Sequence, residues 1–233
     1  MIINTRPMGI GEKTNSLLQQ SKCDFIHLPL TQITKLEPPE SATIFLDNLR
    51  DYDAVIFTSQ SAVKYGVKFF QDCCPDEVTI PIISIGLATQ SLLKELAISS
   101  TVPQTYDSFG LSKLIKKKKY KKCLVFCGKK NPQILATTDA DIDVFPCYES
   151  HDQKDIDFAK IKDINKLIIL IYTQQSLEIL VRNFKRHQMQ TITLISASKR
   201  IHKFASNHDF RKCVLAKTPH DKDMLIAALA ADC

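Results

Sequence analysis

Short apolar runs alternate with amphipathic stretches along most of the chain. The runs AVIF at residues 54–57 and LIILIY at residues 167–172 show no strict alternation of apolar and polar positions. Such continuous runs are typical of strands that are buried on both faces of a parallel sheet. The stretches between the runs place apolar residues at i, i+3, i+4 and i+7, which is the spacing of one helix face. This pattern predicts an α/β protein whose parallel sheets are covered by helices on both faces.

The predicted elements follow one another at short intervals. Strands are expected at residues 2–5, 25–28, 54–57, 82–85, 123–126, 143–146, 167–172, 192–196 and 213–216. Helices are expected at residues 11–21, 61–71, 89–96, 109–117, 176–186 and 220–231. Strands that alternate with helices in this way indicate βαβ units and a parallel sheet.

The second half of the sequence repeats the pattern of the first. AVIFTSQSAVKYGVKFF at residues 54–70 and LIILIYTQQSLEILVRNF at residues 167–184 each read as a strand, a polar turn and a helix. PIISIGLATQSLLKEL and TLISASKRIHKFA form a second matching pair, and the opening IINTRP corresponds to LVFCGK in the middle of the chain. We interpret the chain as a duplication of one α/β unit of about 110 residues, a common domain size.

Polar and glycine-containing turns follow the predicted strands. In open parallel sheets, ligands bind beyond the carboxyl ends of the strands, so these turns form the candidate binding site. The candidate residues are Arg6, Thr58, Ser59, Gln60, Ser61, Gly86, Thr89, Gly128, Lys129, Lys130, Thr173, Gln174, Ser198 and Arg200.

Each turn also has a purely structural interpretation. Ser59 or Ser61 could cap the following helix, and Gly86 could allow close helix packing or a positive backbone angle. Helix amino-ends also bind anions, because their free amides and the helix dipole favour negative charge. Since several such turns share one side of two sheets, we expect them to bind carboxylates or phosphates with help from the nearby basic side chains.

The charge distribution narrows the class of partner. The net charge is +6, from 31 basic and 25 acidic residues, and much of it lies in the run KKKKYKK at residues 116–122. This run is either a solvated helix end or a basic field that steers an anionic partner. The chain has no tryptophan and no aromatic-rich basic stripe, so nucleic acid is not expected as a partner.

No segment predicts a membrane span or export. No apolar run reaches the length of about 18 residues that suggests a span. The amino-terminus lacks a basic region followed by a long apolar segment, so we expect no signal peptide and a cytoplasmic location. The eight cysteines form no CxxC pair. Reduced thiols are therefore expected, with Cys123 and Cys127 as small core residues.

Familiar cofactor and nucleophile motifs are missing from the sequence. The turn after the first strand reads RPMGIG rather than GxGxxG, and neither a GxxxxGK[ST] phosphate loop nor a GxSxG elbow occurs. The histidines form no HExxH pair, and Asp139, Asp141 and Asp143 fit a polar loop better than a metal site. We expect a site without a metal, an organic cofactor or an evident covalent nucleophile.

Five segments together resemble the uroporphyrinogen-III synthase family. They are IINTRPMGIGEKTNSLLQQ, YDAVIFTSQSAV, IISIGLATQSLLKEL, DVFPCYES and SKRIHKFA, which occur in the family's order over nearly the whole chain. The resemblance implies a cofactor-independent lyase of tetrapyrrole and heme biosynthesis. Such an enzyme cyclises hydroxymethylbilane to uroporphyrinogen III, with loss of water and inversion of the last pyrrole ring, ring D. The carboxylates of this linear tetrapyrrole suit the basic balance and the amide-lined turns.

The family's architecture implies two interleaved, flavodoxin-like α/β domains joined by a two-stranded β-ladder. Carried over, one domain comprises residues 1–32 and 152–233, the other comprises residues 36–147, and the ladder or hinge lies at residues 28–36 and 145–153. The substrate would lie between the domains. The resemblance further implies a monomer without a membrane or nucleic-acid partner, with transient hand-over of the substrate from hydroxymethylbilane synthase.

The resemblance also singles out Tyr148 as the catalytic candidate. In the family, a tyrosine near the second crossing is favoured for assisting departure of the substrate's hydroxyl group. A phenol with a pKa of about 10 is protonated at neutral pH and can donate a hydrogen bond or a proton. Alternatively, Tyr148 only packs at the hinge.

The sequence departs from the family's pattern at three turns. CGKKNPQ replaces a glycine-rich turn that often carries arginine, SASKRIHK lacks the glycine and threonine of its counterpart, and Tyr172 stands where Thr58 stands in the first half. Lysine supplies the charge of an arginine but not its bidentate geometry. The alternative function is a two-lobed module that binds a small anionic metabolite without catalysis.

Overall fold

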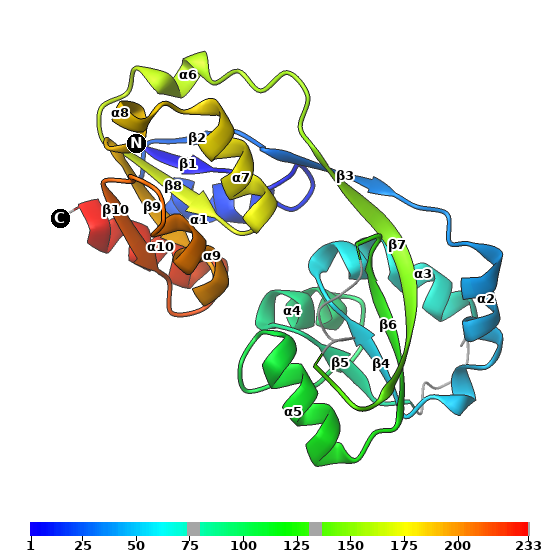
Figure 1. Ribbon diagram of the computed structural model, residues 1–233. Helices are drawn as coiled ribbons and strands as arrows, with labels where there is room; N and C mark the ends of the chain where they lie inside the picture. Colours follow the sequence, from blue (N-terminus) through cyan, green and yellow to red (C-terminus); the bar gives the residue numbers. More distant parts are fainter. Residues whose placement is uncertain (74–79, 131–136, 233) are drawn as a thin grey trace. The chain divides into compact units, whose positions relative to one another are not determined.

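The computed structural model describes residues 1–73, 80–130 and 137–232. Within this part, the chain forms two compact units, each built on its own five-stranded sheet. Unit one contains Met1–Gln32 and His151–Cys233, and unit two contains Ile33–Ser150 (Figure 1). The chain therefore passes from one unit to the other twice, once within strand β3 (Thr31–Lys35) and once within strand β7 (Asp141–Asp152).

Unit one is a parallel sheet, sheet A, with the strand order β10-β9-β8-β1-β2. Its strands are β1 (Ile2–Asn4), β2 (Phe25–His27), β8 (Leu167–Ile171), β9 (Ile192–Ser196) and β10 (Lys212–Leu215). Its helices are α1 (Glu12–Gln20), α6 (Ala159–Lys162), α7 (Gln174–Asn183), α8 (Arg186–Met189), α9 (Lys199–Ala205) and α10 (Asp221–Asp232). Helix α1 packs beside α10, and α7 packs beside α9.

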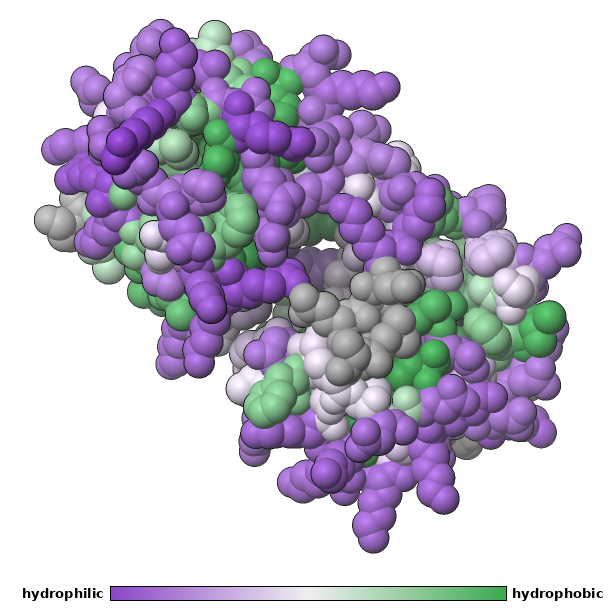
Figure 2. Space-filling model, viewed as in Figure 1, coloured by the Kyte–Doolittle hydropathy of each residue, from purple (hydrophilic) through white to green (hydrophobic). Residues whose placement is uncertain are grey.

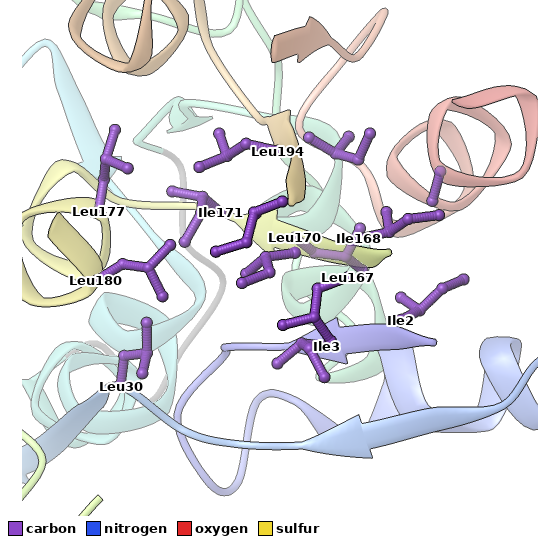
Figure 3. Close-up of a cluster of buried hydrophobic side chains, with 14 of the residues drawn as sticks. Ile2, Ile3, Leu30, Leu167, Ile168, Leu170, Ile171, Leu177, Leu180 and Leu194 are labelled. Atoms are coloured by element: carbon purple, nitrogen blue, oxygen red, sulfur yellow. The ribbon is translucent and has the colours of Figure 1, made fainter. Parts of the chain in front are cut away.

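The core of unit one surrounds its two central strands. All five residues of β8 are buried, as are all five of β9. Figure 3 shows Leu177 and Leu180 of α7 directed at these strands, with Ile2 and Ile3 of β1 nearby. Each fully buried leucine or isoleucine contributes about 1.5–3 kcal/mol to folding. The uninterrupted apolar runs in the sequence are therefore explained by burial on both faces of the sheet.

Unit two is built on sheet B, with the strand order β3-β7-β6-β4-β5. Strand β7 pairs with β6, β6 with β4 and β4 with β5, and all three pairs are parallel. The backbone N–H of Leu36, just after β3, donates to the carbonyl of Cys147 in β7. The remaining strands are β4 (Ala54–Phe57), β5 (Ile82–Ser84) and β6 (Lys122–Gly128). The helices are α2 (Glu40–Asp47), the 3-10 turn η1 (Leu49–Asp51), α3 (Gln60–Cys73), α4 (Leu87–Glu95) and α5 (Ser108–Lys118).

Four phenylalanines form the centre of unit two. The rings of Phe57 and Phe126 are stacked with centroids 4.8 Å apart, and Phe70 of α3 meets both rings edge-on at 6.1 and 6.3 Å. The ring centroid of Phe145 also lies 4.8 Å from that of Phe126. Gly66 brings α3 close to this cluster, since a Cβ built there would lie 2.6 Å from the ring of Phe126. The glycine is therefore required by packing, although it lies inside a helix.

We expect Gly66→Ala to lower the free energy of unfolding by about 1–2 kcal/mol. Alanine gains helix propensity of up to about 1 kcal/mol, but the clash with the buried Phe126 ring costs about 1–3 kcal/mol in an overpacked core. Urea unfolding followed by circular dichroism measures the change. Lys68→Ala, an exposed position on the same helix, is the control and should be nearly neutral. A stabilised Gly66→Ala variant would contradict the close packing.

The predicted fold class is confirmed, because both units are α/β structures whose sheets are mainly parallel. The strand orders also match the internal repeat, with β8 and β4, β9 and β5, β1 and β6, and β2 and β7 in equivalent places. The sequence pattern missed α2, a short helix that follows two prolines and leaves Ile44 exposed. The helix expected at residues 176–186 ends at Asn183, because Phe184 adopts extended backbone angles.

Hydrophilic residues predominate on the face shown in Figure 2. In the described part of the chain, no helix has the length and apolar character needed to cross a membrane. Cys123, Cys127 and Cys147 are buried free thiols, and burial raises the pKa of each to about 12. Cys74 and Cys233 lie outside the described residues.

Candidate functional site

The polar turns of unit two gather at one edge of sheet B. Strands β4, β5, β6 and β7 are parallel, so the turns after β4, β5 and β6 all lie at their carboxyl ends. A register shift at Cys127 and Gly128 places Tyr148 of β7 opposite Gly128. We call this set, residues 58–61, 86–89, 128–130 and 148, the sheet B edge.

Ser59 links a helix start to Tyr148. Its Oγ accepts a hydrogen bond from the backbone N–H of Ala62 at 3.0 Å, which caps the first turn of α3. The same hydroxyl donates to the phenol oxygen of Tyr148 at 3.0 Å. Ser59 therefore both caps α3 and contacts the candidate catalytic residue.

Tyr148 makes two further contacts, one through its ring and one through its backbone. Gly128 lies against its ring, since a Cβ built at Gly128 would lie 3.0 Å from Cζ and 3.3 Å from the phenol oxygen. The carbonyl of Tyr148 accepts the backbone N–H of Lys129 at 2.8 Å. Burial raises the pKa of the Tyr148 phenol above its ordinary value of 10.0, and the Ser59 hydrogen bond lowers this pKa in part. The phenol is protonated at neutral pH.

The other hydroxyls of the sheet B edge have structural partners or are covered. Both the N–H and the Oγ1 of Thr58 donate to the carbonyl of Phe126, at 3.1 and 3.0 Å, which ties β4 to β6. Ser61 and Thr89 are buried at the starts of α3 and α4. Gly86 has extended backbone angles, φ −159° and ψ 169°, so its place does not depend on a positive angle.

The basic side chains of the sheet B edge are exposed. Lys129 pairs with Glu149 at 3.0 Å, and Lys130 is exposed at the end of the described turn. Gln60 is half-buried at the first position of α3. The rest of the turn CGKKNPQ, from residue 131, lies outside the described residues.

In unit one, Arg6 is buried in a polar cluster of its own. Its guanidinium pairs with Asp221 at 3.0 Å, and the two side chains are only 8% and 6% exposed. The guanidinium also lies 3.8 Å above the ring of Tyr172, whose phenol donates to Asp221 at 3.2 Å. Thr14 donates to the same carboxylate at 2.9 Å. Burial raises the pKa of Tyr172 to about 12.

Two of the remaining candidates in unit one are helix caps. Thr173 accepts from the backbone N–H of Ser176 at 3.1 Å at the start of α7, and Ser198 accepts from that of Ile201 at 3.3 Å at the start of α9. Gln174 donates to Glu178 at 2.9 Å, and Arg200 is exposed.

Sequence reasoning did not single out Asp221, Thr14 or the contact between Ser59 and Tyr148. Asp221 carried a weak signal, as an acidic residue in the first turn of a helix, but nothing local pointed to Arg6. Among the described residues, no group of three or more histidine, cysteine or acidic side chains could hold a metal ion. The arrangement of unit two offers a protonated phenol, helix amino-ends and lysines at a single sheet edge.

Comparisons with known proteins identify the family of the chain and structures with a similar fold. The family model described as uroporphyrinogen-III synthase HemD matches residues 12–226. The structure of uroporphyrinogen-III synthetase from Helicobacter pylori 26695 is similar, with a TM-score of 0.58, 16% sequence identity and coverage of 99% of this chain and 98% of that one. A mutant uroporphyrinogen III synthase from the extremely thermophilic bacterium Thermus thermophilus gives a TM-score of 0.63 at 12% identity, with 99% and 98% coverage. No curated protein sequence matches the chain.

Proposed function

The chain belongs to the uroporphyrinogen-III synthase family, and we propose that it carries out the family's ring closure at the sheet B edge, with Tyr148 beside the departing hydroxyl group. The reaction cyclises the linear tetrapyrrole hydroxymethylbilane to uroporphyrinogen III, with loss of water and inversion of ring D. The family match over most of the chain supports the reaction. The contacts of Tyr148 support its place in that reaction.

The first chemical step breaks the bond between carbon and the terminal hydroxyl oxygen. The oxygen leaves as water after it gains a proton, while the pyrrole nitrogen supplies the electron pair that replaces the bond and releases its N–H proton. The product of this step is an azafulvene, and the released proton balances the one that the oxygen gained. A phenol that stays protonated at neutral pH can donate a hydrogen bond to this oxygen as charge develops on it. Tyr148 meets this requirement because burial keeps its pKa above the ordinary value.

Ring inversion then depends mainly on positioning. The azafulvene carbon is attacked within the same molecule, through a spiro intermediate, so the enzyme must hold the linear chain in a folded form. Holding the reacting groups in the correct geometry removes a large part of the activation free energy of such a step. We propose that the carboxylates of the substrate bind the helix amino-ends of α3 and α4, together with Lys129 and Lys130.

The candidates of unit one have a smaller part in this proposal. Thr173, Gln174, Ser198 and Arg200 occupy the equivalent strand ends and would contact the more distant carboxylates. Arg6 would attract the substrate's carboxylates less than the exposed basic side chains do, because its charge is balanced by Asp221 within the unit. We further propose that residues 28–36 and 145–153 act as the hinge, and that the protein works as a cytoplasmic monomer that receives its substrate from hydroxymethylbilane synthase.

The reaction is tested with freshly made hydroxymethylbilane. Without an enzyme this substrate closes spontaneously to the type I isomer, so the isomer ratio reports catalysis. We expect the purified protein to give uroporphyrinogen III, with separation of the isomers by chromatography as the measurement. Heat-inactivated protein is the control. Formation of type I alone would overturn the enzymatic function, and binding of the substrate without type III product would favour the non-catalytic module.

A further inference from the structure

We propose that Ser59 is a positioning residue that orients the phenol of Tyr148, so that the phenol's own proton is available to the substrate. This inference rests on the role proposed for Tyr148 and goes beyond it. It gives Ser59 a function through Tyr148 rather than through a substrate carboxylate. Three observations support this role: the hydrogen bonds of Ser59, the packing of Gly128 and the differences between the two units.

In the contact between the two hydroxyl groups, Ser59 is the donor and Tyr148 is the acceptor. A serine hydroxyl has one proton to donate and two lone pairs to accept with. The Ala62 N–H takes up a lone pair at 3.0 Å and fixes the oxygen at the start of α3, while the proton goes to Tyr148 at 3.0 Å. Because Tyr148 accepts in this contact, it does not donate its own proton to Ser59. The phenol proton must therefore point elsewhere.

Gly128 removes the remaining freedom of the ring. A Cβ at this position would lie 3.0–3.3 Å from Cζ, Cε2 and the phenol oxygen, so the ring rests directly against the glycine. The register shift between Cys127 and Gly128 creates this arrangement, and such irregularities in strand pairing re-aim side chains. Ser59 and Gly128 therefore hold the phenol from two different segments, the turn before α3 and the end of β6.

The equivalent residue of unit one shows that capping does not require a phenol. Thr173 aligns with Ser59 in the internal repeat and caps α7 at 3.1 Å. Its hydroxyl also pairs with the hydroxyl of Ser176 at 2.8 Å, while the neighbouring Tyr172 reaches Asp221 instead. The link between a cap and a tyrosine in unit two is an additional feature, beyond what helix formation needs.

The chemical effect of this contact is on the acidity of the phenol. Donation to the phenol oxygen stabilises the charge that develops there as its proton moves toward the substrate. It thus counteracts the effect of burial on the Tyr148 pKa. The half-buried phenol of Tyr148 without this donor would hold its proton more firmly and assist departure of the hydroxyl group less.

Kinetics of four variants test the inference: Ser59→Ala, Ser59→Thr, Tyr148→Phe and the double variant Ser59→Ala/Tyr148→Phe. We expect Ser59→Ala to lower kcat about five- to tenfold, the worth of one hydrogen bond, with a KM change below about twofold. Ser59→Thr keeps the donor and the cap, so it should restore kcat to within about twofold. The double variant should be no slower than Tyr148→Phe alone, because two residues that act as a unit are non-additive.

A control variant separates positioning from loss of the cap. Asp107 caps α5 in the same unit, where it accepts the N–H of Gly110 at 2.8 Å. Asp107→Ala should lower stability about as much as Ser59→Ala while leaving kcat unchanged. Ultraviolet titration of tyrosinate, taken as the difference from Tyr148→Phe, adds a direct readout. The pKa of Tyr148 should rise in Ser59→Ala and stay close to that of the unaltered protein in Ser59→Thr.

The outcomes distinguish this inference from the function it rests on. If Ser59→Ala leaves kcat unchanged, or if its effect multiplies with that of Tyr148→Phe, Ser59 does not act through Tyr148. If Tyr148→Phe itself keeps full turnover, the role proposed for Tyr148 fails and Ser59 has nothing to position. If the unaltered protein forms no uroporphyrinogen III, the enzymatic function fails.

Discussion

Tyr148→Phe is expected to lower turnover about 100-fold while changing the KM by less than about threefold. In the proposed mechanism, the phenol donates to the departing hydroxyl group, whose charge develops only in the transition state. An interaction made mainly in the transition state affects kcat rather than substrate binding. Phenylalanine keeps the ring that packs against Gly128 and loses only the hydroxyl. Initial rates of uroporphyrinogen III formation over a range of substrate concentrations measure the change.

Tyr52 provides a matched control for this variant. It lies in the same unit, and its phenol donates to Asp143 at 2.7 Å, at the other end of the sheet from Tyr148. Tyr52→Phe removes a phenol hydroxyl of the same kind and should leave turnover unchanged. Turnover of Tyr148→Phe within about twofold of the unaltered protein would exclude the phenol from the mechanism, since proton donation contributes far more than this. A hinge tyrosine that only packs would give that result.

The second large effect is expected on stability, where Asp221→Ala should lower the free energy of unfolding by about 3–5 kcal/mol. The substitution leaves the Arg6 guanidinium buried without its carboxylate partner. It also removes the acceptor of Tyr172 and Thr14. An uncompensated buried charge is much more costly than the loss of an ion pair at the surface. Urea unfolding of the purified variant measures the loss.

Two further variants identify the cause of this loss. Asp209→Ala removes a carboxylate that pairs with Arg186 at the surface, where the side chains are 45% and 75% exposed, and we expect a loss below about 1 kcal/mol. Replacing both members of the buried pair, as in Arg6→Met/Asp221→Leu, should recover a large part of the stability because no charge is left unpaired. Equal losses for Asp221→Ala and Asp209→Ala would contradict the buried pair.

The role of Arg6 illustrates where the sequence was insufficient. The sequence correctly placed Arg6 in the turn after the first strand. An arginine in this turn suggested that it binds a carboxylate of the ligand. The structure supplies a carboxylate from within the unit, Asp221, at the start of the last helix. The two residues are far apart in the sequence, and only the order of strands in sheet A brings them together. A local pattern holds no information on that order.

The turn after β4 shows the opposite case. The run of apolar residues 54–57 predicted a buried strand, and the polar residues that follow predicted a helix start. Both features are present, with Ser59 as the cap. The sequence offered capping and ligand binding as alternatives, and the structure adds a third contact, to Tyr148.

The sequence by itself determined most of the elements, the internal repeat and the edge of each sheet at which the polar turns lie. These follow from hydrophobic periodicity and from the polar residues that end each run, both of which are local. The tertiary structure decided which polar side chains meet: Ser59 with Tyr148, and Arg6 with Asp221. The physical reason is that a hydrogen bond needs its atoms within about 3 Å. Such distances between remote residues depend on strand register and helix packing.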